Sequence, residues 1–212
     1  MEGYTSTINK QWDIKALPLY LILKQIIMTQ TTNGTTSQST TILAIDGAAS
    51  TGYAIYHNGK ITKHGTRVFR ASAHESKSHK YGAWLQSVIA KYHITAIVAE
   101  DTFRKHGKEY EQPKYDNTFK GLNKLQGVLE YISGENGITP VLTAPIEWKQ
   151  VILPTNWGKR TRQLDKFKML ALAQKLGYQL EKPTADDEAD AIGIMLHYLK
   201  RNNLPVVHPS NE

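Results

Sequence analysis

The amino-acid sequence predicts a mixed α/β domain preceded by a short extension. From residue 41 onward, apolar runs of strand length are followed by segments whose apolar residues recur at helical spacing. The predicted order, β-β-β-α-β-α-β-α-α, is typical of an α/β domain with a mixed sheet. A chain of 212 residues has room for one such domain and an appendage, so we expect a single active site.

Residues 1–40 are predicted to form the extension and residues 41–212 the folded domain. Residues 16–28 are mostly apolar but are interrupted by polar residues and a proline, so this segment is too short to span a membrane. It is either a short interaction helix or sequence upstream of an internal start at Met28. The polar run that follows, TQTTNGTTSQST, has the composition of a disordered linker.

Strands and helices are predicted in order along the domain. The first three strands are TILAID, TGYAIYH and ITKHGTRVF, and Asn58-Gly59 favours a hairpin between the last two because both residues tolerate positive φ. The later elements are a helix at 73–92, a strand at 94–100, a charged loop at 104–117, a helix at 119–132, a strand at 138–144, an irregular segment at 148–162, and helices at 163–176 and 186–200. Trp84 and Trp148 are interpreted as packing residues.

The composition favours a basic protein that binds an acidic partner. Lys and Arg number 26 against 19 Asp and Glu, which gives a formal charge of +7 and a pI near 9.4. Such an excess favours nucleic acid as the partner. The absence of cysteine excludes disulfides, thiolate metal sites and cysteine nucleophiles, and it is typical of a reducing compartment. We therefore expect a cytoplasmic protein with no membrane partner.

Four carboxylates occupy positions that favour a metal site. Asp46 ends the first strand and Glu100 the fourth, and sites in open α/β sheets form at strand ends. Asp187 and Asp190 are three residues apart in a predicted helix, which places both on one face. Mg²⁺ and Mn²⁺ prefer oxygen ligands, and two ions about 4 Å apart are able to hold one phosphate between them.

Each of these carboxylates also has a structural interpretation. Asp46 would serve as a turn cap, Glu100 would pair with Arg104, and Asp187 would stabilise a helix N-terminus. The functional interpretation depends on the occurrence of all four residues in the order strand, strand, helix.

The segments that carry these carboxylates resemble the motifs of RuvC-type Holliday junction resolvases. ILAIDGAASTGYAIY resembles the first motif through Asp46, Thr51, Gly52 and Tyr53, although Gly47 stands where the family usually has proline. AIVAEDTF resembles the second motif, DEADAIGI the last, and LNKLQGVLEYI the intervening helix. These resolvases belong to the ribonuclease H-like superfamily, together with retroviral integrases.

The resemblance covers residues 41–200 and implies a fold, an activity and an assembly. The fold is ribonuclease H-like, a five-stranded mixed sheet with its first three strands antiparallel and with flanking helices. The activity is divalent-metal-dependent hydrolysis of a phosphodiester in Holliday junctions or related branched DNA, during recombination and repair. The resemblance also implies a homodimer in the cytoplasm of a bacterium, or of the host cell if a phage encodes it, without a nucleotide cofactor.

The resemblance implies roles for the residues that match the motifs. Asp46, Glu100, Asp187 and Asp190 would bind Mg²⁺ or Mn²⁺, two ions to a site, and Lys166 would be a further catalytic residue. The resemblance and the charge pattern together predict DNA contacts at Phe103, Arg104, Lys105, Lys149 and Lys159, with the aromatic ring stacking on unpaired bases.

Two alternative functions stay open on the sequence alone. A nuclease of the same fold would use the same metal chemistry on RNA-DNA hybrids, flaps or forks. A basic DNA-binding protein would use the acidic cluster for structure and would lack activity. A cleavage assay with and without divalent metal distinguishes an enzyme from a binding protein.

Overall fold

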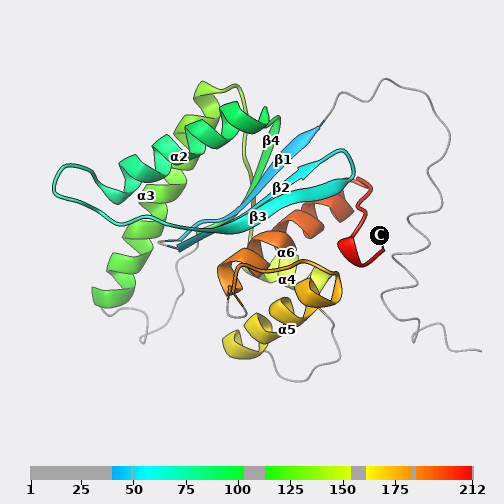
Figure 1. Cartoon of the computed structure of the whole chain (residues 1–212). Coiled ribbons are helices and arrows are strands. Elements are labelled where there is room, and N and C mark those ends of the chain that lie inside the picture. Colours follow the sequence, from blue (N-terminus) through cyan, green and yellow to red (C-terminus); the bar gives the residue numbers. More distant parts are fainter. Residues whose placement is uncertain (1–39, 49, 103–112, 154–160, 183–184, 212) are drawn as a thin grey trace, which may run out of the picture. The chain divides into compact units, whose positions relative to one another are not determined.

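A computed structural model describes one folded unit of the chain (Figure 1). The described residues are 40–48, 50–102, 113–153, 161–182 and 185–211. The chain divides into two units, residues 1–35 and 36–212. The predicted apolar segment and linker lie outside the described residues, so the domain boundary at residue 40 stays a prediction.

Five strands form one mixed sheet, which confirms the predicted α/β class. Their order across the sheet is β3 (Lys60–Val68), β2 (Ser50–His57), β1 (Thr41–Asp46), β4 (Ala96–Glu100) and β5 (Val141–Thr143). The first three strands pair antiparallel, and β4 and β5 extend the sheet beyond β1 as parallel strands. The predicted hairpin turn is present, with φ of 48° at Asn58 and 85° at Gly59.

Helices cover both faces of the sheet, and strand alternation decides which side chains each set of helices meets (Figure 1). Leu43 and Ile45 of β1 belong to the core beneath α2 (Lys77–Tyr92) and α3 (Pro113–Glu135). Ile42 and Ala44 belong to the opposite core, beneath the helices α4 (Pro145–Ile152), α5 (Arg162–Lys175) and α6 (Asp186–Arg201). The even-numbered side chains of β1 therefore point toward α6.

The helix α6 is the central element of that second core. It contacts β1, β2, β3 and β4 on one side and α4 and α5 on the other. Ile192, Ile194 and Met195 are fully buried although they point in different directions around the helix. A helix that is apolar around most of its circumference is an interior helix. Its acidic first turn, by contrast, lies at the edge of the core.

Several predicted boundaries are wrong. Residues 148–152 were expected to be irregular, but they belong to α4, which begins at Pro145 because proline at the first helical position has a favourable φ and needs no hydrogen-bonded N–H. The helix α3 begins at residue 113, within the predicted charged loop. The strand β5 contains only three residues, since Pro140 cannot donate to the sheet.

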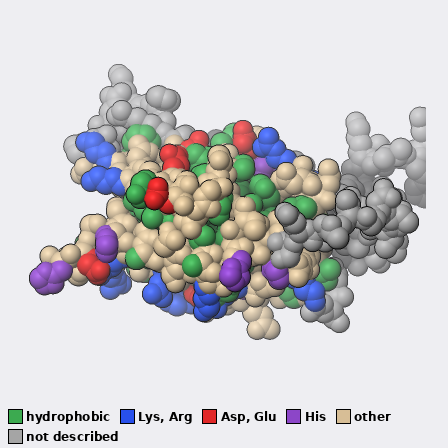
Figure 2. Space-filling view, turned by 90° about the horizontal axis from the view of Figure 1, so that it is seen from above, with side chains coloured by type: hydrophobic (Ala, Val, Ile, Leu, Met, Phe, Trp, Pro, Cys, Tyr) green, Lys and Arg blue, Asp and Glu red, His purple; other side chains and the backbone are tan. Residues whose placement is uncertain are grey.

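The surface and the helix lengths add two observations. Figure 2 shows one face of the molecule, on which Lys and Arg side chains lie in separate groups around the rim. Among the described residues, no helix has the length and apolar character needed to cross a membrane.

Candidate active site

The candidate site begins at the ends of two neighbouring parallel strands. In the β1–β4 ladder Ile45 lies opposite Ala99, so Asp46 and Glu100 occupy the next position on each strand. Strand alternation places Asp46 on the same face as Ala44, and Glu100 on the same face as Val98. Both carboxylates therefore lie at one sheet edge and face the α6 side.

The first turn of α6 reaches this edge by passing over Gly52. Gly52 lies opposite Asp46 in the β1–β2 ladder. A Cβ atom on Gly52 would lie 1.8 Å from the backbone oxygen of Asp187, a distance that no side chain tolerates. The glycine thus lets the helix backbone contact β2 directly. This close approach brings Asp187 and Asp190 to the strand ends that carry Asp46 and Glu100.

The electrostatics show that the four carboxylates influence one another. Burial raises the pKa of Asp46 well above its ordinary value of 3.8, and the charges of Glu100, Asp190 and Asp187 raise it further. Burial also raises the pKa of Asp190, against the opposing effect of the Lys149 ammonium. Asp190 is only 7% exposed. The cluster is therefore a region of unfavourable negative charge.

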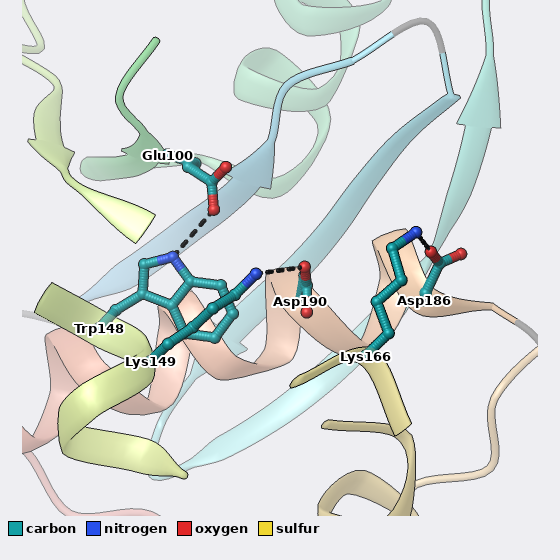
Figure 3. Close-up of polar contacts among 6 residues, drawn as sticks. All are labelled: Glu100, Trp148, Lys149, Lys166, Asp186 and Asp190. Carbon is teal, nitrogen blue, oxygen red and sulfur yellow. Dashed lines mark hydrogen bonds and ion pairs between the residues drawn. The ribbon is translucent and has the colours of Figure 1, made fainter. Parts of the chain in front are cut away.

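The helix α4 supplies a hydrogen-bond donor and a cation to this cluster (Figure 3). The indole Nε1 of Trp148 donates a hydrogen bond of 2.9 Å to Oε2 of Glu100. The Nζ atom of Lys149 lies 3.1 Å from Oδ2 of Asp190. The structure thus places the ammonium of Lys149 within the carboxylate cluster, and its predicted role as a DNA contact stays a prediction.

The donor chemistry of the cluster suits a hard divalent cation. All four side chains offer carboxylate oxygens, the ligand type that Mg²⁺ and Mn²⁺ prefer. The Oδ1 atom of Asp190 is buried and makes no hydrogen bond among the described residues, so it has ligand capacity that the protein does not use. The described part of the chain contains no set of three or more acidic or histidine side chains already arranged at ligand distance. Binding would therefore require the carboxylates to rearrange.

Lys166 lies beside the cluster and pairs with a residue that the sequence analysis did not single out. Its Nζ atom contacts Oδ2 of Asp186, the first residue of α6 (Figure 3). The charge of the same ammonium partly opposes the effect of burial, which raises the pKa of Asp190. The ammonium of Lys166 therefore lies near the candidate ligands. Lys166 is thus close to the cluster, and its catalytic role stays a prediction.

The other predicted DNA contacts cannot be placed. Phe103, Arg104, Lys105 and Lys159 lie outside the described residues. The predicted pairing of Glu100 with Arg104 lies outside them for the same reason.

Sequence reasoning missed Trp148 as a polar partner and the buried pair of His64 and Glu188. Trp148 is fully buried, which agrees with its interpretation as a packing residue, but its N–H is directed at Glu100. Glu188 of α6 is completely buried and its Oε1 lies 2.5 Å from Nδ1 of His64 on β3. For the contact of Trp148 with Glu100, the available signal was a Trp followed by a Lys in a short helix directly after the last strand. No local pattern indicates the second, since the partners are far apart in sequence.

Comparison with known proteins gives matches only at the level of structure. No protein-family profile matches the sequence, and no curated protein matches it significantly. The structure of Thermus thermophilus RuvC in complex with a Holliday junction substrate is 16% identical, with a TM-score of 0.54 over 76% of this chain and 96% of that chain. A second structure of Thermus thermophilus RuvC is 13% identical, with a TM-score of 0.52 over 77% of this chain and 95% of that chain.

These likenesses establish the fold. The domain has the RuvC-type, ribonuclease H-like architecture that the motifs predict, a five-stranded mixed sheet with helices on both faces. At such low identity the likeness concerns the course of the backbone, and the roles of individual side chains rest on the geometry of this chain.

Proposed function

We propose that the protein is a divalent-cation-dependent endonuclease that cleaves four-way junctions or related branched DNA. The observation that carries this proposal is the convergence of four carboxylates around Asp46, whose pKa is raised by desolvation and by the charges of the other three. Carboxylates that raise one another's pKa in this way are more frequent at functional sites than elsewhere in a fold. The RuvC-type fold supports the choice of branched DNA as the substrate class.

Asp46, Glu100, Asp187 and Asp190 would hold the cation. A divalent ion bound there supplies positive charge that stabilises the developing charge on a phosphate and lowers the pKa of attacking water. The residues of the chain have separate tasks: β1 and β4 hold two ligands at fixed strand ends, and α6 brings the other two. The ammonium of Lys166, near Asp190, would lie within reach of a phosphate oxygen.

Binding of DNA would depend on charge and on two copies of the chain. The formal charge of +7 favours association with phosphates. Two sites related by a two-fold axis would cut symmetric strands of one junction, so we propose a homodimer. Light scattering of the purified chain, alone and with a junction, measures the copy number, and a strictly monomeric complex would contradict this part of the proposal.

The decisive experiment compares cleavage and binding of a labelled four-way junction. The intact chain is expected to cut the junction with Mg²⁺ or Mn²⁺ and not with a chelator. Asp46→Asn is expected to abolish cutting while binding stays equal or tightens, because one anion has left a phosphate-binding region. Loss of binding together with cutting would point to misfolding. An RNA-DNA hybrid, a flap and a fork, tested in parallel, determine the preferred substrate.

A non-catalytic DNA-binding protein is the second candidate, and one observation favours it. Lys149 already compensates Asp190, and the described residues include no preformed group of three metal ligands. This candidate predicts tight, salt-sensitive junction binding with no cutting at any concentration of Mg²⁺ or Mn²⁺. Any divalent-dependent cutting that Asp46→Asn removes would exclude it.

A further inference from the structure

We infer that two consecutive residues of α4, Trp148 and Lys149, set the cation affinity of the carboxylate cluster in opposite directions. Trp148 acts as a positioning residue that favours cation binding, and Lys149 acts as an internal cation that competes with it. The inference rests on the proposed function only in requiring that the cluster bind a divalent cation.

Trp148 orients Glu100, one of the four candidate ligands, through one of its carboxylate oxygens. Its side chain is fully buried in the core between α4 and α6, so its indole has little freedom to move. The hydrogen bond of 2.9 Å from Nε1 to Oε2 orients the carboxylate of Glu100 at the end of β4. A donor that orients a ligand without touching the ion raises affinity by reducing the freedom that binding must remove.

Lys149 occupies the position of a positive charge in the cluster. Its Nζ atom lies 3.1 Å from Oδ2 of Asp190, and the two side chains are only 17% and 11% exposed. Both charges are thus largely removed from water. In such surroundings the attraction within an ion pair is strong, and the loss of one partner is costly. A divalent ion that binds Asp190 must displace this ammonium or share the carboxylate with it.

The two residues are also linked to each other. The ammonium of Lys149 lies over the ring of Trp148, 4.6 Å from its centroid, within the range of a cation–π contact. The indole thus receives Lys149 on its face while its edge donates to Glu100. When a divalent ion displaces the ammonium of Lys149 from Asp190, the ammonium is able to keep its contact with the face of the Trp148 ring.

Measurement of Mn²⁺ binding to the full chain without DNA, by calorimetry, tests the inference. Trp148→Phe keeps an aromatic ring but removes the N–H, and it is expected to weaken Mn²⁺ binding by about 10-fold or more. Lys149→Met keeps the apolar stem but removes the charge, and it is expected to tighten binding by about 10-fold. Lys149→Arg keeps the charge and is expected to bind Mn²⁺ close to the level of the unaltered chain.

Matched controls remove the same groups elsewhere. Trp84→Phe removes an indole of α2 that packs against Tyr53. Lys80→Met removes an ammonium of α2 that pairs with Glu75, which precedes the helix. Both are expected to leave Mn²⁺ affinity unchanged. A double-mutant cycle isolates the route of the Trp148 effect: in a Glu100→Gln background, Trp148→Phe is expected to cause no additional loss. This cycle stays informative when Trp148→Phe lowers overall stability.

The outcomes separate this inference from the proposed function. Equal Mn²⁺ affinity of the unaltered chain, Trp148→Phe and Lys149→Met would overturn the inference and leave the proposed function in place. Weaker binding by Lys149→Met would show that Lys149 assists the cation and would also overturn it. No Mn²⁺ binding by the unaltered chain would overturn both, because the cluster would then not be a metal site.

Discussion

Two faces of the N-terminal end of α6 carry carboxylates in opposite states. On one face, both oxygens of the buried Glu188 are satisfied: Oε1 pairs with Nδ1 of His64 at 2.5 Å, and Oε2 accepts the N–H of Glu181 at 2.9 Å. On the other face, Asp190 has one oxygen paired with Lys149 and one that is buried and makes no hydrogen bond within the described part of the chain. Glu188 and Asp190 are only two positions apart, yet the first is a structural carboxylate and the second is a candidate ligand.

The difference teaches how to distinguish the two kinds of buried acid. A carboxylate that serves stability has donors for both oxygens, because unpaired buried polar atoms are costly. A carboxylate that serves binding keeps an oxygen that no donor of the protein uses, so that this oxygen is able to bind a ligand. Exposure alone does not separate them, since Glu188 and Asp190 are both buried.

The largest expected effect comes from Asp46→Asn. This substitution removes a carboxylate of β1 that belongs to the same cluster as Asp190. Its cleavage rate is expected to fall about 1000-fold or more, because an anionic ligand is lost from the centre of the site. Its melting temperature without divalent cations is expected to rise, since the substitution removes a partly desolvated charge that Glu100 and Asp190 repel. Junction cleavage and calorimetric melting check the two signs. A fall in both quantities would contradict the assignment.

Gly52→Ala is expected to disturb both faces together. The added Cβ would meet the backbone oxygen of Asp187 at 1.8 Å, so the first turn of α6 must move away from β2. We expect a loss of about 3 kcal/mol or more in the free energy of unfolding, as for severe overpacking. Gly121→Ala on α3 is the matched control, because no atom lies within 4 Å of the added Cβ. Urea unfolding of the two variants measures the contrast, and equal stabilities would refute the close approach.

Glu188→Gln is expected to affect stability more than chemistry. It weakens the pair that the fully buried Glu188 forms with the partly exposed His64, and the loss of a hydrogen bond to a charged group costs about 2 kcal/mol of unfolding free energy. Its cleavage rate is expected to change far less than that of Asp46→Asn. Chemical denaturation and the junction assay, carried out on the same preparation, compare the two. A loss of cleavage as large as that of Asp46→Asn would place Glu188 in the reaction.

The smallest expected effect is the dependence of stability on pH. Asp46 and Asp190 have pKa values raised by folding, so their contribution to stability is complete below the unfolded pKa, near 3.8 for Asp46, and is lost as pH rises through the folded pKa. The cation-free protein should therefore lose stability upward from that pH, relative to Asp46→Asn. Melting temperatures of both proteins across this range in a chelator, and again with Mn²⁺, test the sign. Parallel curves would contradict it.

The sequence predicted the parts of the site that local patterns determine. Asp46 and Glu100 follow apolar runs of strand length, and parallel strands end at a common edge, so their convergence was predictable. The spacing of Asp187 and Asp190 likewise fixed their common helical face. The hairpin at Asn58-Gly59 and the last helix followed from local patterns too, whereas the antiparallel arrangement of the first three strands was implied by the family resemblance.

The parts that were missed depend on packing between distant segments. The helix α4 is only eight residues long, too short for a clear apolar period, so the ion pair of Lys149 with Asp190 was not predicted. The pairing of Trp148 with Glu100, and of His64 with Glu188, joins residues whose proximity only the assembled core creates. Propensity and periodicity carry no information about such contacts.

The passage of α6 over Gly52 also determines when during synthesis the protein acquires its carboxylate set. Gly52 and Asp187 are roughly 135 positions apart, so their contact closes one of the longest loops in the domain, late in folding. A nascent chain that has emerged only through β5 holds Asp46 and Glu100 but neither of their helical counterparts. On the proposed function, a ribosome-bound intermediate would therefore lack two of the four candidate ligands until the last helix docks.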